Sequence, residues 1–69
     1  MQYYGGESVR IGDTCQSGWA GTCRVVRVNR HGQACLENMR NKRNFTIPVE
    51  DGMREFDLID REEKRHAAL

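Results

Sequence analysis

Long apolar runs, proline and aromatic residues are all scarce in this chain of 69 residues. No stretch approaches the roughly 20 consecutive apolar residues of a membrane-spanning helix, so we expect no membrane partner. A single proline and seven glycines favour short elements joined by tight turns over a proline-rich or low-complexity chain. Because hydrophobic residues make up 38% of the sequence and charged residues 30%, we expect one small globular domain rather than a disordered chain.

The N-terminal residues lack the charged start and the apolar run of a signal peptide, which favours a cytoplasmic protein. The three cysteines, Cys15, Cys23 and Cys35, are an odd number, and reduced thiols suit such a protein better than disulfides. Together with His31 they are the ligand types of a Cys₃His zinc site. They lie eight and twelve residues apart, however, whereas zinc ligands usually come in pairs about two to four residues apart. We therefore expect no metal and no other cofactor.

Charge is segregated along the chain, although the formal net charge is only +1. Residues 24–43 contain six arginines or lysines and a single acid, Glu37. Residues 50–63 contain seven acids and two arginines. The basic middle of the chain is therefore the candidate surface for a polyanionic partner.

Five short segments have the composition of strands. Val9 and Ile11 alternate with polar residues, the period-two pattern of a half-buried strand, and residues 16–18 form a turn. Residues 22–28 are rich in β-branched side chains, and the adjacent Val25 and Val26 predict a bulge or a strand that is buried on both faces. Residues 33–37, 45–47 and 56–59 complete the set, with a hairpin turn at 29–32, a loop at 39–44 and a 3₁₀ turn near 50–52.

We therefore predict an all-β fold, a small five-stranded SH3-like barrel over residues 1–60, because a barrel leaves no sheet edge exposed. Residues 61–69 are predicted to be a short, charged, flexible tail, since this segment has almost no apolar face with which to dock. The expected core consists of Val9, Ile11, Cys23, Val26, Val28, Leu36, Phe45, Ile47, Phe56 and Leu58.

Over about residues 6–60 the chain resembles SH3-like barrels of the KOW and Tudor type. In those barrels a Gly-Asp ends the first strand and a glycine opens the second, at the spacing of Gly12-Asp13 and Gly21. The segment 50–59 similarly resembles their turn into the fifth strand. KOW domains commonly bind RNA or ribosomal and transcription proteins, and Tudor domains bind methylated side chains in aromatic cages. The resemblance therefore implies a binding module.

The layout is also similar to that of the plasmid-borne type II dihydrofolate reductases, which have a Gly-Asp before a Trp-x-Gly turn. Gly12-Asp13 and Trp19-Ala20-Gly21 match this layout. The active pore of that family is lined by a Val-Gln-Ile-Tyr segment, where this chain has Phe-Thr-Ile-Pro at residues 45–48. This second resemblance supports the fold and not the reductase activity.

Candidate catalytic groups are few. A nucleophile needs a base within hydrogen-bond reach and a third group that orients the base. Of the two histidines, His31 falls in the predicted hairpin turn and His66 in the predicted tail. The sequence contains no phosphate-binding loop, dinucleotide fingerprint or zinc-binding helix motif. We expect a protein that is not an enzyme and has no catalytic residues.

Two binding functions remain open. The first is binding of nucleic acid or a ribonucleoprotein, in which cations contact phosphates and Asn41 and Asn44 face bases or sugars. Its expected contact residues are Arg27, Arg30, Arg40, Lys42 and Arg43, joined by Arg24 if it projects on the same side.

The second function is binding of a protein target, as an inhibitor or adaptor of the kind found among immunity proteins and phage or plasmid accessory proteins. Its expected contact residues are Trp19, Tyr3 and Tyr4. An exposed tryptophan often anchors a partner. The alternative for the same three side chains is structural, with Trp19 packed over an open barrel end and the tyrosines covering a neighbouring strand.

Overall fold

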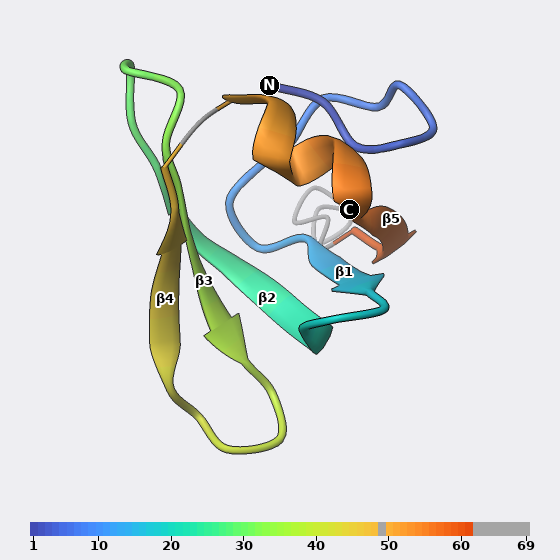
Figure 1. Cartoon of the computed structure of the whole chain (residues 1–69), viewed down its shortest axis with the longest axis vertical. Helices are drawn as coiled ribbons and strands as arrows, with labels where there is room; N and C mark the ends of the chain where they lie inside the picture. Colours follow the sequence, from blue (N-terminus) through green and yellow to red (C-terminus); the bar gives the residue numbers. More distant parts are fainter. Residues whose placement is uncertain (49, 62–69) are drawn as a thin grey trace, which may run out of the picture.

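The structure is a computed structural model, and it describes residues 1–48 and 50–61. In this part of the chain five antiparallel strands form one sheet in the order β4-β3-β2-β1-β5 (Figure 1). The strands are β1 (Thr14–Ser17), β2 (Gly21–Val28), β3 (Ala34–Asn38), β4 (Asn44–Ile47) and β5 (Asp57–Asp60). A 3₁₀ helix, η1 (Glu50–Glu55), connects β4 to β5. The predicted all-β fold is confirmed, as are the strands expected near residues 22–28, 33–37, 45–47 and 56–59.

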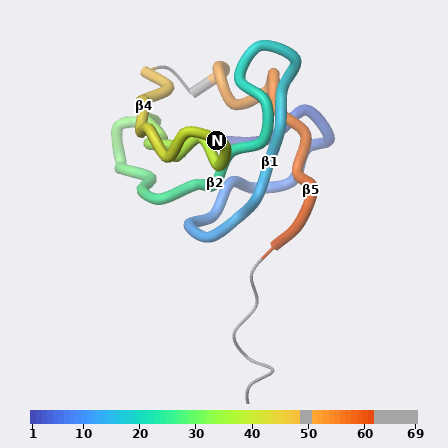
Figure 2. The backbone as a smooth tube through the Cα atoms, turned by 90° about the horizontal axis from the view of Figure 1, so that it is seen from below, coloured from blue at the N-terminus to red at the C-terminus, as the bar shows by residue number. Residues whose placement is uncertain are grey.

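The sheet curls around the core but does not close within the described residues (Figure 2). β4 and β5 are its two edges, and η1 contacts β4 before the chain runs into β5. A helical turn therefore spans the distance between the edges in place of a hydrogen-bonded strand pair. The expected 3₁₀ turn is confirmed and extends over six residues. No helix of the described residues has the length and apolarity needed to cross a membrane.

The first strand lies further along the chain than its pattern predicts. Val9 and Ile11 are outside the named strands, and Ile11 is exposed. The segment around Val9 pairs instead with the N-terminal residues, since Val9 N donates to the Met1 carbonyl at 3.1 Å. β1 begins at Thr14 and includes Gln16 and Ser17, two of the three residues expected to turn, with Cys15 opposite Cys23 of β2.

The bulge predicted in β2 is confirmed, but the prediction of which valine is buried is wrong. The register between β2 and β3 shifts between Val25 and Arg27, which leaves Val26 as the extra residue. Val25 is fully buried and Val26 is 37% exposed. A bulge adds one residue to the strand. The alternation of inward-facing and outward-facing side chains is therefore shifted by one residue beyond it.

The core lies between the curved sheet, the N-terminal segment and η1. Of the predicted core, Cys23, Leu36, Ile47 and Phe56 are buried, whereas Ile11 and Val26 are not. The remaining predicted members, Val9, Val28, Phe45 and Leu58, are partly buried and pack against the core. The buried residues that the pattern did not predict are Tyr3, Asp13, Cys15, Val25, Ala34 and Met53.

Asp13 is a buried carboxylate that joins three distant segments. It accepts hydrogen bonds from the Tyr3 hydroxyl at 2.7 Å, from Arg10 N at 2.9 Å and from Arg61 Nε at 2.9 Å. Burial alone would raise the pKa of Asp13, but the bonds from Arg61, Tyr3 and Arg10 outweigh it and hold that pKa below its usual range. The Gly12-Asp13 pair therefore has a structural role. Asp13 bonds to other segments, and Gly12 before it has a φ of 97°, a conformation that favours glycine.

Arg61 belongs to the folded body, which corrects the predicted start of the tail. Its guanidinium pairs with Asp13 and its Nη2 also donates to the Ser8 carbonyl at 2.6 Å. The side chain is only 23% exposed. The rest of the predicted tail, residues 62–69 with His66, lies outside the described residues.

Candidate functional site

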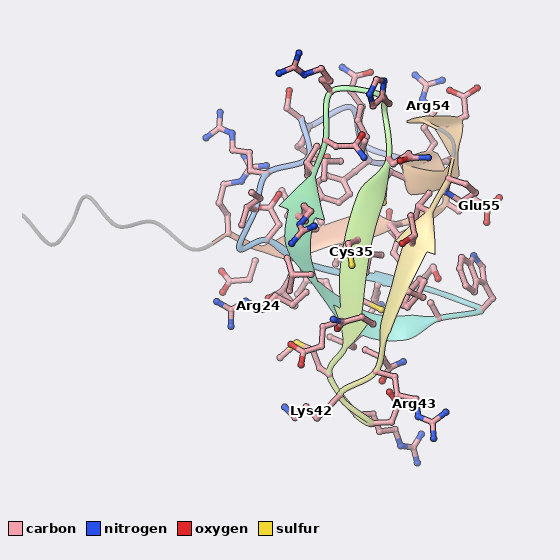
Figure 3. All side chains as sticks on the ribbon, turned by 90° about the vertical axis from the view of Figure 1, so that its left-hand side faces the viewer. Arg24, Cys35, Lys42, Arg43, Arg54 and Glu55 are labelled. Carbon is pink, nitrogen blue, oxygen red and sulfur yellow. The ribbon has the colours of Figure 1, made fainter. Side chains whose placement is uncertain are left out.

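The two faces of the β2–β3–β4 part of the sheet differ in polarity. On the inner face, cross-strand neighbours bring together apolar rows such as Val25, Leu36 and Phe45. The outer face is seen in Figure 3, with Cys35 near its middle. Its cross-strand neighbours are Arg24, Glu37 and Asn44 in one row and Arg27, Cys35 and Thr46 in the next. Polar and charged groups therefore dominate the face that the core does not use.

A turn with three exposed cations ends this face. We call residues 38–43, which join β3 to β4, the basic hairpin. Arg40, Lys42 and Arg43 are all exposed in it, and Figure 3 shows Lys42 and Arg43 at its far end. Three positive charges within four residues give this end of the sheet a concentrated positive potential.

Asparagine side chains hold the basic hairpin in one conformation. Asn38 Oδ1 accepts from the backbone N–H groups of Arg40 at 2.8 Å and Asn41 at 3.2 Å. Asn41 Oδ1 accepts from Arg43 N at 2.9 Å, so this amide oxygen braces the turn. The backbone closes the loop through Lys42 N to Asn38 O and Asn38 N to Arg43 O, both at 2.8 Å. The cations therefore extend from an ordered support.

Lys42 has a φ of 64°, the left-handed region that glycine normally occupies. In the described part of the chain it is the single non-glycine residue with a positive φ. A left-handed conformation costs an ordinary L-residue about 1–2 kcal/mol. The turn carries a lysine at the position where a glycine would relieve this strain, and no local sequence signal reveals it.

The structure divides the predicted cation set into two groups. Arg24 lies on β2 opposite Glu37, the residue before Asn38, and is therefore next to the basic hairpin. Arg27 lies further along the outer face, opposite Cys35. Arg30 is in the β2–β3 turn, at the other end of β3 (Figure 1). The five residues of β3 separate the two turns by roughly 15 Å, so Arg30 does not belong to the same contact surface.

Trp19 lies in the β1–β2 turn with its ring fixed but exposed. The indole makes edge-to-face contacts with Phe45 of β4, at a centroid distance of 5.8 Å, and with Phe56, at 5.6 Å. Its Nε1 donates to Glu55 Oε1 at 2.8 Å. The residue is nevertheless 61% exposed. Trp19 thus packs over the open end of the sheet, one of the two arrangements expected for it, and still presents a large aromatic surface.

Asn38 also connects the basic hairpin to the turn that carries Trp19. Its Nδ2 donates to the carbonyl of Ala20, the residue after Trp19, at 3.0 Å. Met39 N donates to Thr22 O at 3.0 Å, which joins the same two segments a second time. Cations and an exposed aromatic ring that are some twenty residues apart in the sequence therefore lie at one end of the sheet. Sequence reasoning did not identify Asn38, because a polar residue before a polar loop carries no signal of a tertiary contact.

The two predicted tyrosine contacts have different fates. Tyr3 is fully buried, and burial together with its bond to Asp13 raises the pKa of its hydroxyl. It is part of the core and cannot contact a partner, which corrects the prediction. Tyr4 is 79% exposed, but it lies in the N-terminal segment and has no aromatic contact with Trp19 among the described residues.

The cysteines do not form a site. Cys15 and Cys23 are buried, and burial raises the pKa of the Cys15 thiol to about 12 and also raises that of Cys23. Both thiols stay protonated and inert near neutral pH. Cys35 is partly exposed on the outer face. Within residues 1–48 and 50–61, no three His, Cys, Asp or Glu residues are placed to hold a metal ion, and His31 is an exposed turn residue.

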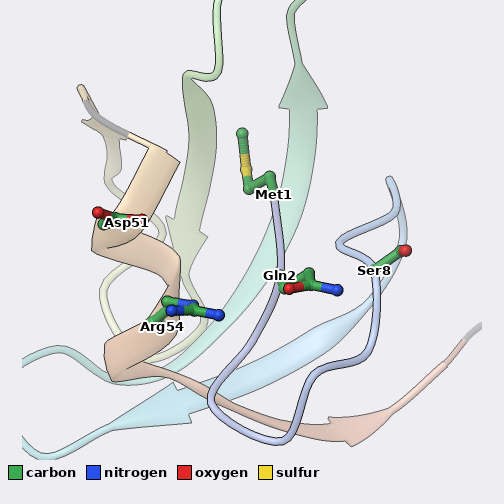
Figure 4. Close-up of a pocket in the computed structure, with 5 residues that line it drawn as sticks. All are labelled: Met1, Gln2, Ser8, Asp51 and Arg54. Carbon is green, nitrogen blue, oxygen red and sulfur yellow. The ribbon is translucent and has the colours of Figure 1, made fainter.

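Two shallow pockets lie away from the basic hairpin. One, of about 420 Å³, is lined by Met1, Gln2, Ser8, Asp51 and Arg54 (Figure 4). The other, of about 360 Å³, lies where Met1 meets the β2–β3 turn and includes Arg30 and His31. The first brings an acid and a base of η1 together with polar neighbours, which gives it no net preference for an anion or a cation.

Comparison of the chain with protein-family models, with curated proteins and with solved structures gives no match.

Proposed function

We propose that this protein is a non-catalytic module that binds nucleic acid, free or within a ribonucleoprotein, through the basic hairpin. The observation that carries the proposal is the arrangement of Arg40, Lys42 and Arg43 on a turn whose backbone is held by Asn38 and Asn41. Cations on an ordered turn bind a phosphate backbone with a smaller loss of conformational entropy than cations on a loose loop. The resemblance to KOW-type barrels supports the same class of partner.

The strain at Lys42 is a second argument for this site. Residues held in left-handed conformations occur preferentially at functional sites, where the position of the side chain outweighs the cost. Here the φ of 64° places a cation, rather than a glycine, beside two arginines. Arg24 and Arg27 extend the proposed surface along the outer face, whereas Arg30 is left out of it.

The test is the salt dependence of binding. Each phosphate contact releases condensed counterions, so the logarithm of the affinity falls with the logarithm of the salt concentration by about 0.7 to 0.9 per contact. Replacing Arg40, Lys42 and Arg43 by alanine is expected to lower this slope by about 2 to 3. The matched control replaces Arg10, Arg30 and Arg54 by alanine, which removes the same charge from exposed positions outside the hairpin.

The control is expected to keep nearly the full slope. Equal losses in both triple variants would show that total charge, and not the hairpin, determines binding. Absence of salt-dependent binding to any RNA or DNA at micromolar concentration would overturn the proposal. The protein-binding alternative would then rest on Trp19 and Tyr4, because Tyr3 is buried.

A further inference from the structure

We infer that the ligand is single-stranded nucleic acid, and that one of its bases stacks on the exposed face of Trp19 while its phosphates contact the basic hairpin. This inference rests on the proposed function and goes further, since it names the strandedness of the ligand and a second contact type.

The Trp19 ring is already immobilised before any ligand arrives. Phe45 and Phe56 contact it edge-to-face, with interplanar angles of 63° and 76°. Glu55 accepts the hydrogen bond of its Nε1 at 2.8 Å. With the indole 61% exposed, the ring keeps a free surface on which a base can stack without loss of side-chain entropy.

Asn38 joins the turn that carries the ring to the turn that carries the cations. The same side chain accepts from the backbone of the basic hairpin and donates to Ala20 beside Trp19. The Trp19 ring is also close to Arg43 along the chain at the start of β4. Trp19 contacts the ring of Phe45, and Phe45 comes two residues after Arg43. Two residues of a strand span roughly 7 Å. A base on Trp19 and a phosphate near Arg43 can therefore belong to the same short stretch of one strand.

An unpaired base is the partner that fits an exposed aromatic ring next to cations. In a duplex each base is covered on both faces by its neighbours, so an outside ring has no π-face to reach. In a single strand the faces are available, and alternation of basic groups with aromatic rings is how proteins bind such strands without sequence preference. The basic hairpin alone would contact the phosphates of either form equally well.

The experiment uses Trp19 as its own reporter, because it is the single tryptophan of the chain. Fluorescence is recorded while the protein is titrated with oligo-U, with oligo-dT, with a duplex of equal phosphate count and with inorganic polyphosphate. We expect quenching by one or both single strands and little change with polyphosphate, which has charges but no bases. The two single-strand arms separate RNA from DNA.

Variants separate stacking from charge. Trp19→Leu is expected to weaken single-strand binding roughly 5- to 150-fold, the range of one base–aromatic stack, and to leave polyphosphate binding unchanged. Trp19→Phe retains a ring and is expected to lose less, which keeps the test valid if the leucine variant folds poorly. Tyr4→Leu removes another highly exposed aromatic side chain and serves as the control with unchanged affinity.

The outcomes also distinguish this inference from the proposed function. Salt-dependent binding that is equally tight for duplex, single strand and polyphosphate, with unchanged fluorescence, would overturn the stacking inference and leave the basic hairpin in place. Binding of none of the four probes would overturn both. Two results together support the inference: quenching of the unaltered protein by single strands, and a loss of single-strand affinity in Trp19→Leu but not in Tyr4→Leu. The affinities of the variants are measured from the anisotropy of a labelled oligonucleotide, because Trp19→Leu has no tryptophan to report binding.

Discussion

The β2–β3 and β3–β4 turns have similar frameworks but use different residues at the strained position. Each turn begins with an asparagine whose Oδ1 accepts two backbone N–H groups of the turn, Asn29 in the first and Asn38 in the second. Each then contains a residue with positive φ, which is Gly32 at 80° in the first turn and Lys42 at 64° in the second. Glycine adopts this conformation without steric cost and lysine does not.

The outward bonds of the two turns differ as well. Asn29 Nδ2 donates to Gln33 Oε1 within its own turn, whereas Asn38 Nδ2 donates to Ala20 O in a different turn. The side-chain bonds of Asn29 stay within the β2–β3 turn, whereas Asn38 attaches the basic hairpin to the Trp19 turn. A strained cation and a tertiary attachment on the same turn indicate that the basic hairpin does more than reverse the chain.

The largest effect is expected in β2, the strand that leads into the β2–β3 turn and pairs with β3. Val25→Ala is expected to lower the free energy of unfolding by about 2–3 kcal/mol, because it removes buried methyl groups and leaves a void. Val26→Ala is expected to cost less than about 1 kcal/mol, since Val26 is the exposed bulge residue. Urea unfolding of both variants measures the difference. Equal costs would contradict the assigned position of the bulge.

The next effect compares the two asparagines directly. Asn38→Ala removes the acceptor of two N–H groups and the amide donor to Ala20 O, which Cys23 Sγ contacts only at 3.7 Å, and is expected to cost about 2 kcal/mol. Asn29→Ala removes bonds that are all exposed and is expected to cost about 1 kcal/mol or less. Chemical denaturation measures both. If Asn29 proved the more costly residue, the attachment through Ala20 would not contribute to stability.

A smaller change in stability is expected when the residues with positive φ in the two turns are substituted. Lys42→Gly is expected to stabilise the fold by about 1 kcal/mol by removing left-handed strain, and to weaken nucleic-acid binding by removing a cation. Gly32→Ala is expected to destabilise by about 1 kcal/mol for the converse reason. Lys42→Asn is the control, because asparagine tolerates this conformation but carries no charge. A Lys42→Gly protein that is no more stable than the original would show that the strain is relieved elsewhere.

The smallest effect is expected in the free energy of unfolding between pH 7 and pH 5. The asparagine amides that hold the two turns do not titrate, so they add no dependence on pH. The body of the protein, by contrast, contains the paired carboxylate Asp13. Its pKa in the folded state lies below the unfolded value, so its contribution to stability is complete above about pH 4 and is lost as the pH falls through the folded pKa. Urea midpoints measured against pH test this. Asp13→Asn is expected to remove the acid-dependent step along with part of the stability.

The sequence predicted the parts of the fold that depend on neighbouring residues. The β-branched run with its Val25-Val26 pair led to β2 and its bulge, and the turn formers at 29–32 led to the β2–β3 hairpin. The position of β1 could not be obtained in this way. Asp13, the residue before β1, is buried and bonds to Arg61, 48 residues further along the chain, and no local pattern reveals that contact.

The candidate site was predicted in composition but not in arrangement. The cluster of Arg40, Lys42 and Arg43 is visible in the sequence, and so is Trp19. Their common position results from the Asn38 to Ala20 bond, between residues that are 18 apart, and no pattern encodes that contact. The left-handed conformation of Lys42 was hidden for a similar reason, since the side chain does not reveal the sign of φ.

The bond between Asp13 and Arg61 also constrains the order of events during synthesis. A chain growing from its N-terminus produces Tyr3, Asp13 and the β1–β2 hairpin long before Arg61 and the β5 residues that pair with β1. Contacts of such high sequence separation form late and slow down folding. The carboxylate of Asp13 must therefore remain hydrated on the ribosome until nearly all of the described chain has emerged. The nascent protein can form its hairpins early, but the Asp13 bond can complete the core only after Arg61 has emerged.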